Sequence, residues 1–149
     1  MSELGDLYQE VILDHGRRPR NFGPLPGATH HAEGLNPLCG DHFDVQALVE
    51  DGTVREVRFT GTGCAISRAS ASVMTGLVKG KRPEEIEALF KTFQHLVTEG
   101  LGAVPDPAAL GKLAVFGGVH EFPSRVKCAS LAWHALRAAL LGGGTTSTE

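Results

Sequence analysis

The chain has 149 residues and a net charge of −3 with histidine neutral. Its length fits one domain around a single core, and the lack of positive charge argues against nucleic acid as a partner. No secretory signal opens the sequence, and no apolar run approaches the roughly 18 residues that cross a bilayer. With an odd cysteine count, three, a complete disulfide framework is not expected. We therefore expect one cytoplasmic domain over residues 1–149, without a membrane segment.

The N-terminal part predicts a helix, a basic loop and a short strand. Apolar residues recur at helical spacing from Leu4 to Ile12, and this helix should end at Gly16. Residues 17–27 are rich in arginine, proline and glycine, which favours a solvent-exposed basic loop over a dedicated docking site. A short strand is expected over residues 28–34.

A β-hairpin follows, centred on the turn dipeptide Asp51-Gly52. Apolar and polar residues alternate on both sides of this turn, as expected for half-buried strands. A strict two-residue turn would place apolar residues opposite polar ones. A shift by one residue, such as a bulge produces, instead pairs Val45 with Phe59 and Ala47 with Val57.

The open end of this hairpin gathers residues that can bind a metal. Either register brings Asp41 beside Cys64, since neighbouring strands lie about 4.8 Å apart. Cys39 lies in the loop just before Asp41. Thiolates and carboxylates are both zinc ligands, so the turn chemistry predicts that these three residues can share one ion.

The second half of the chain predicts helices. A sheet of about three antiparallel strands followed by helices is typical of an α+β fold with the helices on one sheet face. The expected helical segments are 66–78, 83–97, a short stretch at 108–116 broken by Gly117-Gly118, and a last helix from Pro123-Ser124. Residues 142–149 should form a frayed tail.

The remaining cysteine, Cys128, lies in the last predicted helix. Cys64 and Cys128 are both expected in or just before a first helical turn, where free N–H groups favour a thiolate. Arg125 and Lys127 precede Cys128, and their charge would offset an anionic site around it. The candidate ligands number four, as in a tetrahedral zinc site: Cys39, Asp41, Cys64 and Cys128.

Five short motifs carry a family resemblance, in order and over nearly the whole chain. They are residues 15–23 (HGRRPRNFG), 36–41 (NPLCGD), 61–67 (GTGCAIS), 79–81 (KGK) and 127–131 (KCASL). Together they resemble the IscU/NifU-type iron–sulfur cluster assembly proteins. The three-cysteine combination is the most specific part of this resemblance.

Within that family, the chain is most similar to the SufU-type branch of zinc-bound sulfur acceptors. Lys127 stands where the IscU scaffolds have a histidine, and the stretch from Thr98 to Glu121 is longer than theirs. Residues 122–126 only partly resemble the chaperone-recognition segment of those scaffolds. The run 125–133 (RVKCASLAW) looks especially like the SufU-type branch.

The resemblance implies a function, a cofactor and partners. It implies zinc held by Cys39, Asp41, Cys64 and Cys128, and a pyridoxal-phosphate cysteine desulfurase that delivers persulfide sulfur. Cys39 is the expected acceptor because it lies in a loop beside a glycine. The sulfur would pass to downstream iron–sulfur assembly proteins, so we expect a sulfurtransferase-like carrier without independent small-molecule turnover.

Other interpretations remain open. The same four residues could hold a [2Fe–2S] cluster during its assembly and transfer, or the zinc could be purely structural in an interaction module. A disulfide between Cys39 and Cys64 is a further alternative, disfavoured in a reducing compartment. Taken alone, Asp41 is better explained as a turn or strand-end residue than as a ligand. His30, His31, His95 and His134 are interpreted as surface or half-buried side chains, and His42 is expected to point away from Asp41 if the strand alternates.

Overall fold

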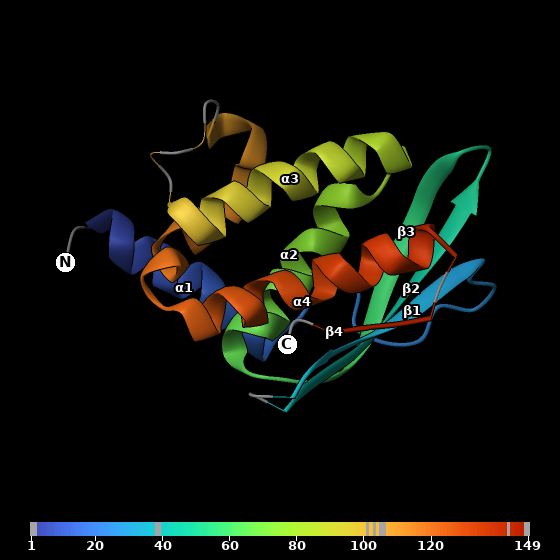
Figure 1. The fold of residues 1–149 in the computed structure, drawn as a ribbon, viewed down its shortest axis with the longest axis horizontal. Helices are drawn as coiled ribbons and strands as arrows, with labels where there is room; N and C mark the ends of the chain where they lie inside the picture. The colour runs from blue at the N-terminus through green and yellow to red at the C-terminus, as the bar shows by residue number, and fades with distance from the viewer. Residues whose placement is uncertain are drawn as a thin grey trace.

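The computed structural model describes residues 3–37, 40–100, 102, 104, 107–142 and 144–147 (Figure 1). One helix precedes three strands, and four further elements follow before a short last strand. In chain order they are α1 (Glu3–Arg17), β1 (His30–Asn36), β2 (Asp41–Glu50), β3 (Thr53–Thr62), α2 (Ala65–Val78), α3 (Pro83–Glu99), the 3₁₀ segment η2 (Pro107–Glu121), α4 (Pro123–Leu140) and β4 (Gly144–Ser147).

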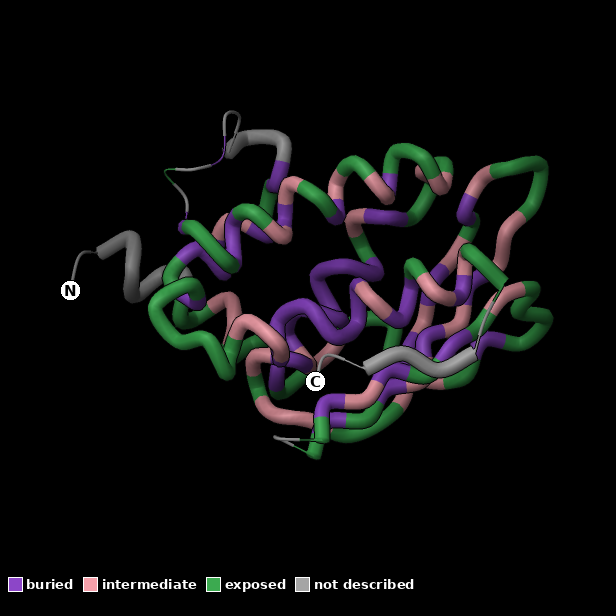
Figure 2. Tube along the Cα trace, viewed as in Figure 1, coloured by how far each residue is buried: buried purple, intermediate pink, exposed green. Residues whose placement is uncertain are grey.

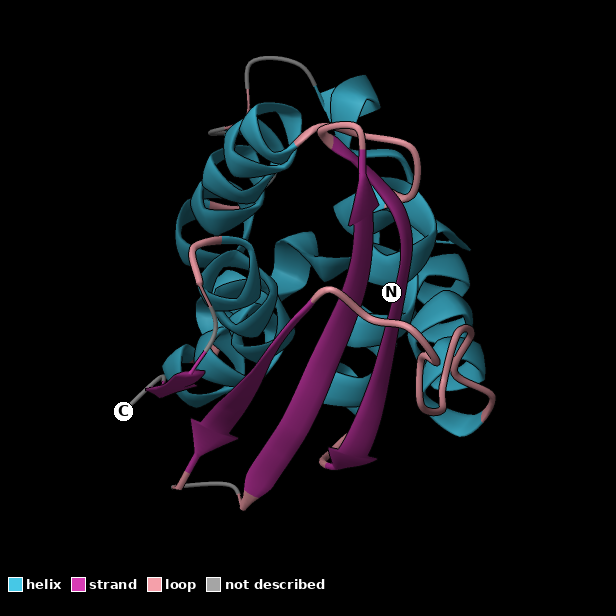
Figure 3. Ribbon diagram, turned by 90° about the vertical axis from the view of Figure 1, so that its right-hand side faces the viewer, coloured by secondary structure: helices cyan, strands magenta, loops and turns pink. Residues whose placement is uncertain are grey.

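The strands form one sheet in the order β3-β2-β1-β4. The pairs β1–β2 and β2–β3 are antiparallel, whereas β4 runs parallel to β1. Figure 3 shows the helices gathered on one side of this sheet, while the loop before β1 crosses part of the other side, where the Leu25 N–H donates to the Gln46 side chain at 2.6 Å. The expected α+β fold is confirmed. The tail differs from the expectation, since residues 144–147 pair with β1 instead of fraying.

The hairpin has the shifted register. Val45 lies opposite Phe59 and Ala47 opposite Val57, as the apolar pattern predicts. The turn itself has two residues, Asp51 and Gly52, with φ of 53° and 74°, which is the conformation of a two-residue hairpin turn. An irregularity at Leu48/Val49 then shifts the pairing by one residue, so the bulge and not a longer loop aligns the apolar faces.

The core lies between the sheet and the helices. In Figure 2, α2 runs through the middle of the molecule as a mostly buried helix. Phe43 and Phe59 present edge-to-face rings from the sheet, with centroids 5.6 Å apart, and Trp133 of α4 stacks on Phe93 of α3 at 5.1 Å. Trp133 is almost completely buried, as expected for a core residue.

Helix α4 lies directly against β1 because a glycine allows it. A Cβ on Gly34 would stand 3.1 Å from Ala135 Cβ and 3.2 Å from Leu131 Cδ1, tighter than ordinary packing. This close approach carries Cys128, which lies one turn before Leu131 in α4, to the end of β1. The small residues of α4 and Gly34 thus position the last cysteine over the sheet.

Two helix boundaries differ from the predictions. Helix α1 continues through Gly16, which packs against the backbone at Ala65 of α2, where a side chain would be only 3.1 Å from the Ala65 oxygen. Gly117-Gly118 does not break the 3₁₀ segment; its kink lies at Gly111, with φ of 54° and ψ of −128°. At Gly16, close packing against α2 explains why glycine occupies a position inside the helix.

The N-terminal motif anchors its loop to α2. The His15 ring nitrogen Nδ1 lies 2.7 Å from Ser72 Oγ, which also accepts the Arg20 backbone N–H at 2.7 Å. Asn21 donates its amide to Thr75 Oγ1 at 3.0 Å. Arg20 pairs with Asp14 at 2.6 Å, so this arginine of the basic loop is already engaged inside the chain.

Candidate metal centre

Asp41 opens strand β2 at the mouth of the hairpin. Its side chain faces inward and the residue is only 2% exposed. One carboxylate oxygen, Oδ1, accepts the backbone N–H of Cys64 at 3.0 Å across the mouth. The predicted juxtaposition of Asp41 and Cys64 is therefore confirmed, and this hydrogen bond holds the two side chains in one place.

Cys64 is the N-cap of α2. Its sulfur accepts the backbone N–H of Ser67 at 3.4 Å, so the thiol sits at the positive end of the helix. The Ser67 hydroxyl lies 3.6 Å from the same sulfur. Gly63 must lack a side chain here, because a Cβ would collide with Ser67 Oγ, stand 2.7 Å from Phe43 Cζ and 3.0 Å from Asp41 Oδ1.

Cys128 enters from α4 and is completely buried. It lies in the second turn of that helix, so the expectation that it would occupy the first turn is wrong. Asn36, the last residue of β1, donates its side-chain amide to Cys128 Sγ at 3.6 Å. The Ser124 carbonyl lies 3.6 Å from the same sulfur, and Ser70 of α2 ties the helix down by donating to the Ala129 carbonyl.

The three side chains converge. Ligand atoms of Asp41, Cys64 and Cys128 all lie within 4.8 Å of one another. These residues come from three separate segments: the start of β2, the N-cap of α2 and the second turn of α4. The second carboxylate oxygen, Asp41 Oδ2, is buried and has no hydrogen-bond partner among the described residues. A buried carboxylate oxygen without a partner is costly unless a cation satisfies it, so the arrangement fits a metal ion.

Electrostatics favours a thiolate at Cys64. The pKa of the Cys64 thiol is lowered to about 5, chiefly by the hydrogen bond from Cys128 and also by the Ser67 N–H and hydroxyl. Burial and the negative charge of Asp41 act in the opposite direction. A thiolate is the form that binds a metal or attacks sulfur. Cys64 carries a free thiol, which contradicts the disulfide alternative.

The other predicted site residues are placed as follows. Cys39 lies outside the described residues, between exposed Pro37 and exposed Gly40. Arg125 is exposed and Lys127 is half-buried, both on α4 ahead of Cys128. His30, His31, His95 and His134 are exposed or half-buried, as expected. His42 is exposed and faces Glu33 at 3.9 Å, away from the inward side chain of Asp41.

Residue-type reasoning missed two contributors. Asn36 donates its side-chain amide to one cysteine sulfur, and Ser67 donates its backbone N–H to another and places its hydroxyl 3.6 Å from that same sulfur. Both positions fall in the motifs that carry the family resemblance, but neither residue type is a usual metal ligand. The spacing of three between Cys64 and Ser67, which is an N-cap pattern, was a usable signal. The partner of Asn36 is 92 residues away and left no local signal.

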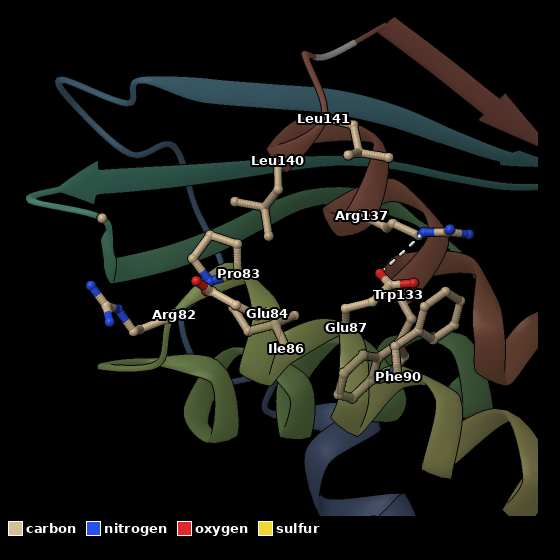
Figure 4. Close-up of a pocket in the computed structure, with 11 residues that line it drawn as sticks. Arg82, Pro83, Glu84, Ile86, Glu87, Phe90, Trp133, Arg137, Leu140 and Leu141 are labelled. Atoms are coloured by element: carbon tan, nitrogen blue, oxygen red, sulfur yellow. Dashed lines mark ion pairs between the residues drawn. The ribbon is translucent and has the colours of Figure 1, made fainter.

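A separate hollow lies between the hairpin turn, the start of α3 and the end of α4. Its volume is about 470 Å³, and it is lined by an apolar wall that includes Ile86, Phe90 and Trp133. Figure 4 shows the ion pair of Glu87 with Arg137, 3.2 Å, at its edge. None of the converging metal-binding side chains lines it, so it is distinct from the candidate centre.

The comparison with known families decides the assignment. The model of the NifU-like N-terminal domain matches residues 7–141, most of the chain. The chain belongs to this family. All three cysteines of this NifU-like domain lie within the matched residues. Within the described residues no helix is long and apolar enough to cross a membrane.

Relatives of this NifU-like domain include both expected branches. It is 38% identical to the iron–sulfur cluster assembly scaffold protein IscU of Streptococcus pyogenes, over 94% of this chain and 86% of that protein. It is also 38% identical to the zinc-dependent sulfurtransferase SufU of Bacillus subtilis, over 91% and 90%. A crystal structure of a putative SUF-system scaffold from Fervidobacterium islandicum superposes with a TM-score of 0.81 at 34% identity, over 88% and 94%. The identity to the IscU scaffold and to the SufU sulfurtransferase is the same, 38%, so sequence identity alone does not assign the chain to either branch.

Proposed function

We propose that this chain is an iron–sulfur cluster biogenesis protein that accepts persulfide sulfur from a cysteine desulfurase at a zinc-bound Cys3Asp site and passes it on. The observation that carries the proposal is the convergence of Asp41, Cys64 and Cys128, with one carboxylate oxygen buried and without a partner among the described residues. Cys39, two residues before Asp41, would complete the four ligands.

The donor set fits zinc. Two described thiols and a carboxylate, with Cys39 as the fourth, make the number and type of ligands that tetrahedral zinc prefers. Bound zinc would hold the thiols as thiolates and keep them from reacting until a partner arrives. Three thiolates and a carboxylate exceed the charge of one Zn²⁺, and the proposal gives Arg125 and Lys127 the role of offsetting that excess.

Cys39 is the proposed sulfur acceptor. Cys128 is completely buried in α4, and Cys64 is engaged as the cap of α2, so neither is placed to meet a large partner. Cys39 lies between two exposed residues, Pro37 and Gly40. In the proposed step, its thiolate attacks the terminal sulfur of the desulfurase persulfide. A new S–S bond forms at Cys39, the desulfurase S–S bond breaks, and the desulfurase cysteine leaves as a thiolate.

The scaffold function is the second candidate. The Streptococcus relative is named as a scaffold and matches as closely as the sulfurtransferase does. A [2Fe–2S] cluster would then be the cargo, built on the same residues, since clusters also use thiolates with occasional non-cysteine ligands. Lys127, in place of the histidine of those scaffolds, favours the sulfur acceptor.

Two measurements test the proposal. Elemental analysis of the purified protein should give about one zinc per chain by the ligand count, and iron with acid-labile sulfide would favour the scaffold. Incubation with a cysteine desulfurase and cysteine should then load one sulfur on the protein, detected as a mass increase on the Cys39 peptide. Cys39→Ala should bind the desulfurase but accept no sulfur. Full sulfur acceptance by that variant would contradict the proposal and support the alternative that the zinc is purely structural.

A further inference from the structure

Asn36 is a buried amide at the candidate centre. It ends β1, is 0% exposed, and lies opposite Asp41 in the register of β1 and β2. Its Nδ2 points at Cys128 Sγ, 3.6 Å away, within the range of an N–H···S hydrogen bond. Its Oδ1 has no hydrogen-bond partner in the part of the chain that the structure describes. Among the described residues, the Asn36 side chain therefore forms a hydrogen bond only as a donor, through its NH₂ group.

Burying a polar amide in a packed core is unfavourable unless its hydrogen bonds contribute. A sulfur accepts weakly as a thiol but strongly as a thiolate, because a charged acceptor strengthens the bond. The amide of Asn36 therefore orients the Cys128 sulfur, and its N–H would strengthen its bond to that sulfur once a metal is bound. Outer contacts of this kind orient metal ligands and set their affinity.

We propose that Asn36 is a positioning residue of the metal centre, whose side-chain amide holds Cys128 as a fixed thiolate ligand by an N–H···S hydrogen bond. This inference rests on the proposed metal-binding function. It gives the centre two kinds of thiolate. Cys128, buried and held by β1, stays on the metal, while the loop thiolate before Asp41 is the one that leaves to accept sulfur.

Two variants separate this role from simple packing. Asn36→Leu keeps a similar volume and removes the donor, and Asn36→Asp keeps the shape but replaces the donor with an acceptor. Ser70→Ala is the matched control, because Ser70 is buried and holds α4 beside Cys128 without donating to its sulfur. Each protein is stripped, then titrated with Zn²⁺ against a chromophoric chelator and separately with Co²⁺.

Both Asn36 variants should bind Zn²⁺ about 10- to 100-fold more weakly than the wild type, the usual effect of removing an outer-shell partner. In the Co²⁺ form of Asn36→Leu, the thiolate-to-cobalt absorption should move to lower energy, since an unbonded thiolate gives up electrons more easily. Ser70→Ala should lower thermal stability but leave the zinc affinity and the cobalt spectrum unchanged.

Wild-type zinc affinity and an unchanged cobalt spectrum in the Asn36 variants would overturn the proposal. If Asn36→Leu fails to fold, Asn36→Asp tests the proposal by itself. Weaker Zn²⁺ binding by Asn36→Asp would support the proposal, and unchanged or tighter binding would overturn it. A wild-type chain that takes up neither metal would overturn this inference together with the proposed function. Normal metal binding by the wild type without sulfur acceptance would sink the proposed function alone.

Discussion

The carboxylate of Asp41 accepts the backbone N–H of Cys64 at 3.0 Å across the mouth of the hairpin. This bond uses only Oδ1 and leaves Oδ2 buried beside the two described thiols. Asp41 thus has two tasks in one side chain, because it fixes the start of α2 through one oxygen and presents the other to the candidate metal position.

The first prediction is that Asp41→Ala weakens zinc binding by more than about 100-fold, beyond the effect of losing an outer-shell contact. The loss of the labile oxygen ligand should also make the site better at retaining an iron–sulfur cluster. A chelator competition and an anaerobic cluster reconstitution measure the two effects. Asp44→Ala is the control, since Asp44 lies on the opposite face of β2. Unchanged zinc affinity in Asp41→Ala would show that Asp41 is not a ligand.

A second prediction concerns Gly63. Gly63→Ala would push a Cβ against Asp41, Phe43 and Ser67, and overpacking of this kind costs about 1–3 kcal/mol. We expect a lower free energy of unfolding and a loss of zinc, because the clash displaces Asp41 itself. Gly76→Ala, in the exposed part of α2 with no atom within 4 Å of the added Cβ, should gain about 0.5–1 kcal/mol and keep its zinc. Equal behaviour of the two variants in urea melts would contradict this account.

The third prediction concerns Cys64 in metal-stripped protein. Because Cys128 and Ser67 lower its pKa to about 5, Cys64 should be alkylated by iodoacetamide at nearly its full rate at pH 7. Peptide mapping across pH 4–9 gives the midpoint for this cysteine. Cys128→Ala removes the largest cause of the shift and should raise the midpoint toward the ordinary thiol value of about 8.5. A wild-type midpoint already near that value would refute the assignment.

Stability should fall in mild acid, as a fourth prediction. Burial lowers the pKa of His15, helped by the charges of Arg20 and Lys112, and burial also lowers the pKa of His134. The folded state therefore binds fewer protons than the unfolded state just below pH 6.5, so stability is complete above about 6.5 and declines as the pH falls below it. Urea melts between pH 5 and 8 should show this slope.

Two variants assign the slope to particular residues. His15→Asn keeps an acceptor near Ser72 and should flatten the pH dependence, even if stability at pH 8 drops. His95→Asn changes an exposed residue of α3 and should leave the slope as it was. A slope that survives in His15→Asn at full size would place its origin elsewhere.

The hairpin could be predicted from the sequence because its information is local. A period of two in apolar residues and the dipeptide Asp51-Gly52 together allow few registers, and any of these places Asp41 near Cys64. Half of the candidate centre follows from that alone. The start of α2 was equally readable, since Cys64 is followed by a helical apolar pattern and caps it.

The other half depends on contacts between distant segments. The apolar face of α4 shows that the helix is buried, but which strand it covers is decided by Gly34, whose role is visible only once Leu131 lies against it. The donation from Asn36 to Cys128 is of the same kind. The pairing of residues 144–147 with β1 also escaped the sequence, because a glycine, threonine and serine segment is compatible with a tail or an edge strand.

The irregularity at Leu48/Val49 lies roughly 20 Å along the strand from His42, at about 3.4 Å per residue. Arg55 is the unpaired residue that creates it, and every pair nearer the open end inherits the offset. If Arg55 were instead paired with Leu48, as in a ribbon without the bulge, Asp41 would lie opposite Thr62 instead of Gly63 and one strand would turn its apolar face outward. The bulge near the turn therefore determines which residues face each other at the open end of the hairpin, where the candidate centre lies. Hairpin tips usually tolerate sequence changes, but here a change that forces regular pairing at Leu48/Val49 should disrupt the candidate centre at the far end of the hairpin.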